Sequence, residues 1–404
     1  MKPRVVIIGG GAAGFFCAAN IDERLYDVFI LEQAHEVLQK VKISGGGRCN
    51  VTHACFDPGV LVSYYPRGEK ELLSVFSRFQ PRDTVAWFEA RGVKLKTEKD
   101  GRMFPLSDTS ATITELLKKI CEEKKFFVNT LSVVYRIEKA TKGYIVHCAQ
   151  KSYPADFIVF TTGSVPKSFN ILESLGHSIV PLVPSLFTFC CDHPLLQDLS
   201  GTVFAHAIVN LESYKAKEEG ALLITHWGFS GPAILKMSAR EARLLAEKNY
   251  VFSVRINFLG LPKSHALDLL THYKNSNPKT RLGSAKVFSV THRFWERVLS
   301  FLNIEAHKML GNISSKEMSR IIEGLCSMEF CISGKSPFKE EFVTAGGVLL
   351  KEINFRNMSS RVLPRFYFAG EVLDIDALTG GFNFQACWSE AWLIAQDLNL
   401  MKTG

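Results

Sequence analysis

Two patterns of hydrophobic and polar positions divide this chain. Near each end, a short apolar run leads into glycines and then into a helix-forming segment: RVVII at residues 4–8 precedes GGGAAGF, and FYFA at residues 366–369 precedes a loop and then TGGF. Short, largely apolar runs of this kind are typical of strands buried on both faces of a parallel sheet. We therefore predict a strand–glycine–helix unit at each end, the second with a helix over residues 382–398.

In the middle of the chain, the spacing of apolar positions predicts strands and then helices. Residues 131–164 predict a strand hairpin followed by a strand ending at Thr161-Thr162-Gly163. Residues 186–261 contain short alternating runs such as TVFAHAIVN and VFSVRINF, which predict an antiparallel barrel or sandwich. Residues 262–328 have helical periodicity, for example in SSKEMSRIIEGLCSM.

These patterns predict an α/β fold with an α+β insert. Residues 1–185 and 343–404 form a split Rossmann-like domain, because its two strand–glycine–helix units lie at opposite ends of the chain. Residues 186–261 and 329–342 form an inserted antiparallel β-barrel domain, and residues 262–328 form a small helical subdomain.

Composition narrows the class of protein. Hydrophobic residues make up 47% and charged residues 22% of the chain, which excludes a disordered protein. The net charge of +8 comes from scattered lysines and arginines, so we do not expect a nucleic-acid partner. No apolar stretch reaches the roughly 18 residues that span a bilayer, so no membrane association is expected. Glycines interrupt the N-terminal apolar run, which argues against a signal peptide.

The cysteines and histidines give no sign of a disulfide framework or a metal site. Ten cysteines occur without CxxC spacing, and the eleven histidines include no HExxH pair. We expect reduced, mostly buried thiols in a cytoplasmic protein without a bound metal.

The first glycine run has the spacing of a dinucleotide-binding turn, Gly9-x-Gly11-x-x-Gly14. In such a turn the first glycine permits the tight bend, the second lets the backbone approach a pyrophosphate, and the third allows close helix–strand packing. A second apolar run, residues 28–31, ends at Glu32, which can accept hydrogen bonds from the ribose hydroxyls of an adenosine. An acid here disfavours a 2′-phosphate, so the ligand is NAD or FAD.

The C-terminal unit favours FAD. FAD is long, and a segment far away in sequence is needed to meet its ribityl chain and flavin ring. Asp374 and the Gly370 backbone would hold ribityl and phosphate oxygens, and the helix after Gly381 would direct its positive end at the N1/O2 edge of the flavin. The alternative is an ordinary terminal helix that begins at a glycine.

The chain also resembles the HI0933-like flavoproteins, which are NAD(P)/FAD-dependent and aminoacetone-oxidase-like enzymes. The matching stretches follow the order of the family and span nearly the whole chain: VVIIGGGAAG, KISGGGRCNVT, GHSIVPLVPSL, THWGFSGPAIL, VTAGGV and FYFAGEVLDIDALTGGFNFQ. The chain departs from the family after Gly163, where SVPKSFNILESLGH replaces a second glycine and a loop of small residues.

The resemblance implies further site residues. SGGGRCN would lie beside the flavin and the pyrophosphate, Val134 would meet the adenine, and the TTG sequence would pass the pyrophosphate. Arg48 can offset phosphate or reduced-flavin charge, and Cys49 is either a redox partner of the flavin or an inert buried thiol. The predicted cofactor-binding residues are Gly9, Gly11, Ala12, Ala13, Gly14, Glu32, Gln33, Lys42, Ser44, Gly45, Gly46, Gly47, Arg48, Cys49, Asn50, Val134, Thr161, Thr162, Gly163, Gly370, Glu371, Asp374, Thr379, Gly380, Gly381, Phe382, Asn383 and Ala386.

The predicted function is that of an FAD-dependent oxidoreductase, in which flavin transfers hydride or electrons to or from an unidentified small molecule. NAD(P)H is a candidate transient reductant and oxygen a candidate second substrate; no second GxGxxG marks a separate NAD(P)H domain. No residue constellation identifies a catalytic base, and Glu371, His226 and Ser230 are candidates for a site role or a structural one. Two alternatives remain: an FAD-dependent RNA-modifying enzyme, since the chain is basic, and a non-catalytic flavin-binding interaction protein.

Overall fold

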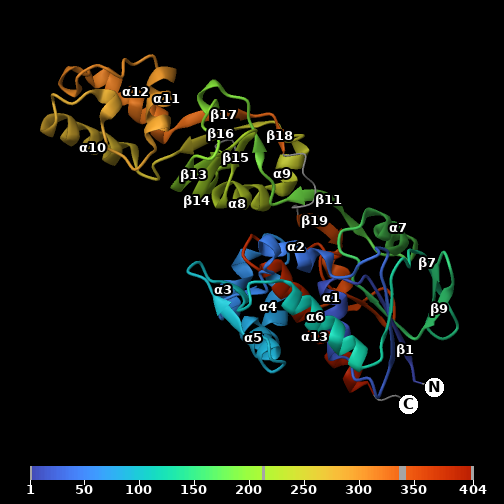
Figure 1. Ribbon diagram of the computed structural model, residues 1–404. Helices are drawn as coiled ribbons and strands as arrows, with labels where there is room; N and C mark the ends of the chain where they lie inside the picture. The colour runs from blue at the N-terminus through green and yellow to red at the C-terminus, as the bar shows by residue number, and fades with distance from the viewer. Residues whose placement is uncertain (1, 212–213, 336–342, 402–404) are drawn as a thin grey trace. The chain divides into compact units, whose positions relative to one another are not determined.

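The computed structural model of the protein describes residues 2–211, 214–335 and 343–401 (Figure 1). The chain forms two compact units. Met1–Leu182 and Thr344–Gly404 make up the split unit, and Val183–Val343 make up the inserted unit. We predicted the corresponding boundaries of the split domain at residues 185 and 343. The strands β11 (Ile179–Ser185) and β19 (Val343–Val348) pair with each other where the chain passes between the units.

A Rossmann-like parallel sheet forms the core of the split unit, as predicted. Its strand order is β20-β21-β22-β10-β1-β2-β6, and the pairs from β22 to β6 are parallel. In register, Ile8 of β1 lies opposite Phe160 of β10, and Phe160 lies opposite Phe368 of β22. The loops that follow these three strands therefore begin at the same edge of the sheet. The strands are β1 (Arg4–Ile8), β2 (Asp27–Leu31), β6 (Phe127–Asn129), β10 (Phe157–Phe160), β20 (Ile353–Asn354), β21 (Ser359–Ser360) and β22 (Phe366–Phe368).

The first and last helices of the chain pack against each other beside this sheet (Figure 1). The rings of Phe16 in α1 and Trp388 in α13 are 5.0 Å apart, and both side chains are fully buried. Near the other end of α13, the Tyr26 hydroxyl donates to the Leu398 carbonyl at 2.7 Å. These contacts join the two ends of the sequence into one layer.

The remaining elements of the split unit surround this core. The helices are α1 (Ala12–Asn20), α2 (Gln39–Gly47), α3 (Pro58–Leu61), α4 (Glu69–Phe76), α5 (Pro81–Glu89), α6 (Ala111–Glu123), α7 (Pro166–Ser174) and α13 (Phe382–Leu400). Two small antiparallel sheets have the orders β3-β5-β4 and β7-β8-β9. Their strands are β3 (Thr52–His53), β4 (Leu95–Thr97), β5 (Arg102–Pro105), β7 (Val134–Lys139), β8 (Tyr144–Cys148) and β9 (Ser152–Ala155).

The inserted unit contains the predicted antiparallel strands, in the order β17-β16-β13-β14-β15-β12-β18. These form one antiparallel sheet, with β17 and β18 at its ends in the part of the chain that the structure describes; the sequence predicted an antiparallel barrel or sandwich here. The strands are β12 (Phe189–Cys190), β13 (Val203–Leu211), β14 (Ala216–Thr225), β15 (Gly228–Ser230), β16 (Phe252–Asn257), β17 (Met328–Ile332) and β18 (Gly334–Lys335). Residues 336–342 of the predicted return to the barrel lie outside the described residues.

The helices predicted over residues 262–328 are present, and they share a hydrophobic core with the sheet of the inserted unit. Phe294 lies with its ring 4.7 Å from Phe204 and 4.9 Å from Phe258. Burial of such large rings stabilises the packing of the helices on the sheet. The helices of the inserted unit are α8 (Pro232–Arg240), α9 (Ala242–Glu247), α10 (Lys263–Ser276), α11 (His292–Phe301) and α12 (Ser315–Cys326).

Among the described helices of both units, none combines the length and apolar character that a membrane crossing requires.

Candidate cofactor site

The first glycine turn has the geometry that its spacing predicts. Gly9 has φ +110°, and an added Cβ would lie 2.3 Å from the Thr161 carbonyl oxygen, so only glycine fits this bend. At Gly14 a Cβ would lie 2.2 Å from the Gly9 oxygen, which explains the close helix–strand packing. At Gly11 a Cβ would meet nothing within 4 Å. The position assigned to a pyrophosphate is thus open, while the other two glycines are enclosed by protein.

Glu32 lies beside this turn at the end of β2. Its Oε2 accepts a hydrogen bond from the Gly10 N–H at 2.7 Å, and its Oε1 accepts one from the Ala34 N–H at 2.8 Å. The neighbouring Gln33 is exposed. The Ser132 N–H donates to the Glu32 carbonyl at 2.8 Å, which brings the segment before Val134 to the same edge. The ribose contact of Glu32 and the adenine contact of Val134 remain predictions.

Thr161 fixes the turn from the neighbouring strand. Its hydroxyl lies 3.1 Å from the Ile8 carbonyl oxygen and 3.0 Å from that of Gly9. The Thr162 hydroxyl donates to Ser168 Oγ at 2.9 Å, at the start of α7. The segment after Gly163, for which the sequence predicted a departure from the family that it resembles, contains the nine-residue helix α7, which begins at Pro166.

The second glycine run is partly helical rather than a simple loop. The helical turns that begin at Gln39 end at Ser44, which has non-helical backbone angles. Gly45, Gly46 and Gly47 all have positive φ. An added Cβ at Gly46 or Gly47 would meet nothing within 4 Å. Lys42 is exposed and pairs with Glu36 at 3.2 Å. The run presents open backbone to its surroundings, as a site for a flat ring requires.

Arg48 is held by acidic residues. Its Nη1 lies 2.6 Å from Glu98 Oε1 and 3.5 Å from Asp108 Oδ1, and its guanidinium lies 4.0 Å from the centre of the Phe104 ring. Two carboxylates therefore balance the charge that we assigned to phosphate or reduced flavin.

Cys49 is fully buried, and burial raises the pKa of its thiol to about 12. The thiolate, the reactive form of cysteine, is therefore scarce at neutral pH. Of the two predicted roles, this environment favours the inert buried thiol.

Three polar groups of the C-terminal loop have protein partners. The Gly370 N–H donates to Glu390 Oε2 at 2.6 Å, and Asp374 Oδ1 accepts from the Gly346 N–H at 3.0 Å. Glu371 forms an ion pair with Lys40 and accepts a hydrogen bond from the Thr344 N–H at 3.0 Å. These bonds define the loop shape, and the contacts of Gly370 and Asp374 with a cofactor remain predictions.

Asn50 joins the second glycine run to the start of α13. With its amide oriented to satisfy both ends, its oxygen accepts from the Gly381 N–H at 2.9 Å and its nitrogen donates to the Thr52 carbonyl at 3.0 Å. Gly380 and Gly381 have φ values of +140° and +90°, which suit this turn. Two glycine-containing segments that are more than 300 residues apart thus meet at one place.

Asn383 and Phe382, at the start of α13, contact residues outside that helix. The Asn383 side chain exchanges hydrogen bonds with the Ala377 backbone at 3.0 and 3.3 Å. Phe382 packs against both Tyr64 and His53, with ring centres 4.2 and 4.6 Å away, and the rings of His53 and Tyr64 are themselves 5.9 Å apart. Ala386, Ala12 and Ala13 are buried, and Thr379 is exposed.

Sequence reasoning missed Glu390. This carboxyl lies fully buried on α13, and burial raises its pKa to about 8. Its Oε1 has no hydrogen-bond partner among the described residues. The available signal was an acid in the otherwise apolar stretch ACWSEAWLIA.

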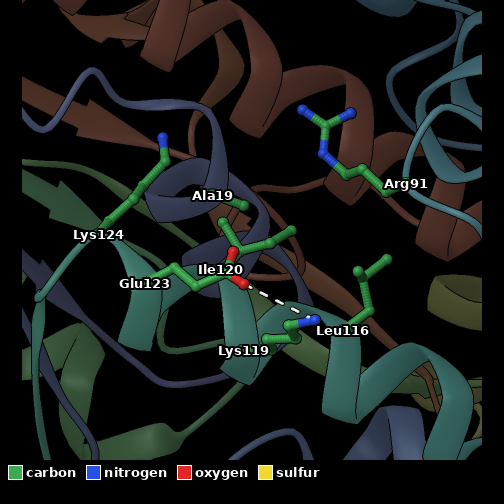
Figure 2. Close-up of a pocket in the computed structure, with 7 residues that line it drawn as sticks. All are labelled: Ala19, Arg91, Leu116, Lys119, Ile120, Glu123 and Lys124. Atoms are coloured by element: carbon green, nitrogen blue, oxygen red, sulfur yellow. Dashed lines mark ion pairs between the residues drawn. The ribbon is translucent and has the colours of Figure 1, made fainter.

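A surface hollow of about 360 Å³ opens elsewhere on the split unit (Figure 2). Ala19, near the C-terminal end of α1, lines it together with residues of α6 and Arg91. Ala19 lies eight positions after Gly11, which corresponds to about 12 Å of helix. The hollow is therefore distinct from the glycine-lined region.

The residues that meet at the edge of the parallel sheet fit FAD. Within the described chain, no side chain caps the first turn of α1 or of α13, so both helices begin with N–H groups suited to anionic or electron-rich ligand atoms. Gly11 leaves space for a pyrophosphate, and Glu32 supplies an acid for a ribose. No group of three or more His, Cys, Asp or Glu side chains with the proximity of a metal site occurs in the described ranges.

Comparisons with known proteins agree on the class of protein. The sequence profile of a family described as HI0933-like protein Rossmann domain matches residues 3–397. The chain is 28% identical to a ribosomal RNA dihydrouridine synthase from Escherichia coli, over 98% of both chains. It is 26% identical to a 3-dehydro-bile acid delta(4,6)-reductase from Clostridium scindens, over 96% of this chain and 97% of the relative.

Among solved structures, the fold is similar to that of a 3-ketosteroid-delta4-(5alpha)-dehydrogenase from Rhodococcus jostii RHA1. The TM-score is 0.50 and the identity 11%, with 98% of this chain and 100% of the other covered. At this identity the likeness concerns the fold alone.

Proposed function

The chain belongs to the HI0933-like family of FAD-dependent oxidoreductases, and from this premise we propose that it reduces a carbon–carbon double bond conjugated to a carbonyl group, with uridine in ribosomal RNA as its substrate. The observation that carries the proposal is the pair of relatives that match nearly the whole chain and are named for reductions of this kind. Their names also favour an enzyme over the non-catalytic flavin protein that we considered.

The two named reactions share one chemistry. Dihydrouridine differs from uridine by saturation of the C5–C6 double bond, which is conjugated to the C4 carbonyl. A delta(4,6) double-bond system next to a 3-keto group is conjugated in the same way. In each case one hydride and one proton are added across a double bond that the carbonyl makes electron-poor.

RNA is favoured over a steroid for two reasons. The RNA-modifying relative is matched at slightly higher identity and coverage than the bile acid reductase. The chain also carries a net charge of +8, which attracts a polyanion. Because these charges are scattered along the sequence, we expected no nucleic-acid partner. The relative named for RNA modification leads us to propose one instead.

FAD, when bound and reduced by a donor such as NAD(P)H, supplies the hydride. The chain's own residues bind and orient. The N-terminus of α1 at Gly11 would hold the pyrophosphate, Glu32 the adenosine ribose, and the N-terminus of α13 the flavin N1/O2 edge. Asn50 keeps the second glycine run and the start of α13 together. Glu390 accepts a hydrogen bond from the Gly370 N–H and so fixes the turn at Gly370.

The proposal is tested by incubating FAD-loaded protein and NADH or NADPH with unmodified ribosomal RNA. Nucleosides are then released and weighed by mass spectrometry, and a 3-keto-delta(4,6) steroid is assayed in parallel. We expect a two-dalton gain at a uridine, dependent on the nicotinamide donor. Reduction of the steroid without any reduction of RNA would assign the enzyme to the other substrate class.

A further inference from the structure

The inserted unit contains a hollow of about 410 Å³ between the β14–β15 turn, the loop over residues 197–200 and the start of α11. Its lining includes Gln197, Asp198, Thr225, His226 and Arg293. We propose that this hollow is a subsite for single-stranded RNA, in which Arg293 meets a phosphate and the aromatic residues of the turn meet a base. The inference rests on the proposed ribosomal RNA substrate.

Arg293 of α11 lines one side of the hollow, and Arg297, on the next turn of the same helix, holds the loop that lines it. Arg297 donates to the Gln197 carbonyl at 2.7 Å and pairs with Asp198 at 3.0 Å. Arg293 donates to the Ser200 carbonyl at 3.1 Å. The loop is thus clamped, and the charge of Asp198 is balanced.

Arg293 keeps its positive charge for a ligand. Its hydrogen bonds go to the Ser200 carbonyl and, at 3.4 Å, to the Thr202 hydroxyl, both of which are neutral. No carboxylate pairs with it within the described ranges. A guanidinium held by neutral acceptors at the mouth of a hollow is well suited to a phosphate.

The β14–β15 turn supplies the opposite side. His226, which lines the hollow, is exposed, and Trp227, the next residue in the same turn, is 41% exposed, with ring centres 6.5 Å apart. The turn is pinned, because the Cys191 N–H donates to the Trp227 carbonyl at 2.8 Å and the Gly201 N–H donates to the Ile224 carbonyl at 2.9 Å. An aromatic ring on a fixed backbone provides a stacking platform for an unpaired base.

Thr225 adds an unsatisfied polar group. Its Oγ1 is buried and has no hydrogen-bond partner in the described part of the chain. Since buried hydroxyls are normally paired, this atom in the lining is suited to a polar group of a ligand.

The hollow on the split unit is less suited to a phosphate, because most of its cations are paired with carboxylates (Figure 2). Its Lys119 pairs with Glu123 at 3.7 Å, and its Lys124 lies 3.6 Å from Glu23. Carboxylates thus balance two of its three cations, so it offers less to a polyanion.

The test uses FAD-loaded full-length protein and a fluorescent single-stranded oligoribonucleotide, with Kd measured over a series of salt concentrations. Arg293→Gln should weaken binding about tenfold and reduce the slope of log K against log salt by about 1. Trp227→Ala should weaken binding about tenfold with the slope unchanged, because stacking releases no counterions. Thr225→Val, which keeps the side-chain shape, should weaken binding by about threefold.

Two matched controls lie away from the hollow. Arg320, like Arg293, donates to a backbone carbonyl, that of Leu302, and Phe301 is a similarly exposed aromatic residue at 37%. Arg320→Gln and Phe301→Ala should leave Kd within about twofold of the unmodified protein. Equal effects in variants and controls would overturn the subsite, and so would the absence of RNA binding by the unmodified protein. The uridine assay distinguishes this proposal from the proposed function. If the protein reduces uridine but its Arg293 and Trp227 variants bind RNA normally, the subsite is wrong and the proposed function stands.

Discussion

The backbone N–H of Gly370 donates to the buried carboxyl of Glu390 at 2.6 Å. This bond joins the turn after β22 to the middle of α13, close to Ala13 of the first helix: a Cβ added at Gly370 would lie 3.3 Å from the Ala13 methyl group and 3.3 Å from Cys387 Sγ. The turn that the sequence assigns to the cofactor therefore rests on an acid that its burial keeps largely protonated at neutral pH.

Glu390→Gln should remove a pH-dependent loss of stability. The pKa of Glu390 is raised from 4.5 to about 8 in the folded protein, so its contribution is fully present below pH 4.5 and is lost as the pH rises through 8. The two limits differ in the free energy of unfolding by roughly 5 kcal/mol. Glutamine keeps the acceptor for Gly370 and cannot ionise. Melting temperatures from about pH 6 to pH 9 should fall less steeply in the variant than in the unmodified protein.

The exposed Glu296 provides the control for this change. Glu296→Gln should leave the pH profile of the melting temperature unaltered. Parallel profiles for Glu390→Gln and the unmodified protein would show that Glu390 does not titrate in this range.

Gly11→Val and Gly14→Ala should separate cofactor loss from fold loss. A Cβ added at Gly11 meets no protein atom within 4 Å, so the variant should fold normally and lose bound FAD. A Cβ at Gly14 collides with the Gly9 oxygen at 2.2 Å, so that variant should melt several degrees lower even without FAD. Flavin absorbance and apoprotein melting give the two readouts. A Gly11→Val protein that remains yellow would place the pyrophosphate elsewhere.

Glu32→Gln should weaken FAD binding about tenfold, because a ribose hydroxyl loses a charged acceptor. The flavin absorption spectrum should stay the same, since the acid is assigned to the adenosine end. Titration of apoprotein with FAD measures the affinity. A large spectral change would instead place Glu32 next to the ring.

Arg48→Ala should act mainly on stability. The side chain is shared between Glu98 and Asp108 and covers the Phe104 ring, so its truncation removes packing on that ring as well as two ion pairs that solvent screens. We expect melting to fall by a few degrees and the flavin reduction potential to change little. A shifted potential at unchanged stability would restore the direct cofactor role that the sequence predicted.

Cys49 should resist alkylation in the native protein. Its thiol is fully buried and its pKa is raised to about 12, whereas Cys331 is exposed. Brief treatment with iodoacetamide followed by peptide mass spectrometry should label Cys331 and spare Cys49. Rapid labelling of Cys49 would indicate an accessible thiolate.

The sequence predicted the parts of the fold that local pattern determines. Apolar runs followed by glycines identified β1, β10 and β22 and the helices α1 and α13, because turn geometry and strand burial are encoded within a few residues. The partners of Arg48 were not predictable, since Glu98 and Asp108 lie 50 and 60 residues further along the chain. The raised pKa of Glu390 was hidden for the same reason, because it depends on burial by distant segments.

The inserted unit gives a second example. Helical and strand periods were both recognised there, but periodicity does not report which elements share a core. Phe294 packs on Phe204 and Phe258 and thereby joins helices and sheet in one unit. The apolar face of a helix predicts which residues are buried, but it does not predict which residues they contact.

The central claim is that both ends of the chain hold one FAD molecule. Hydrogen exchange of apoprotein with and without one equivalent of FAD, read by peptide mass spectrometry, tests it most directly. We predict slower amide exchange over residues 9–14 and over residues 379–384 at the same FAD concentration. Protection of one segment alone, or of neither, would contradict the account.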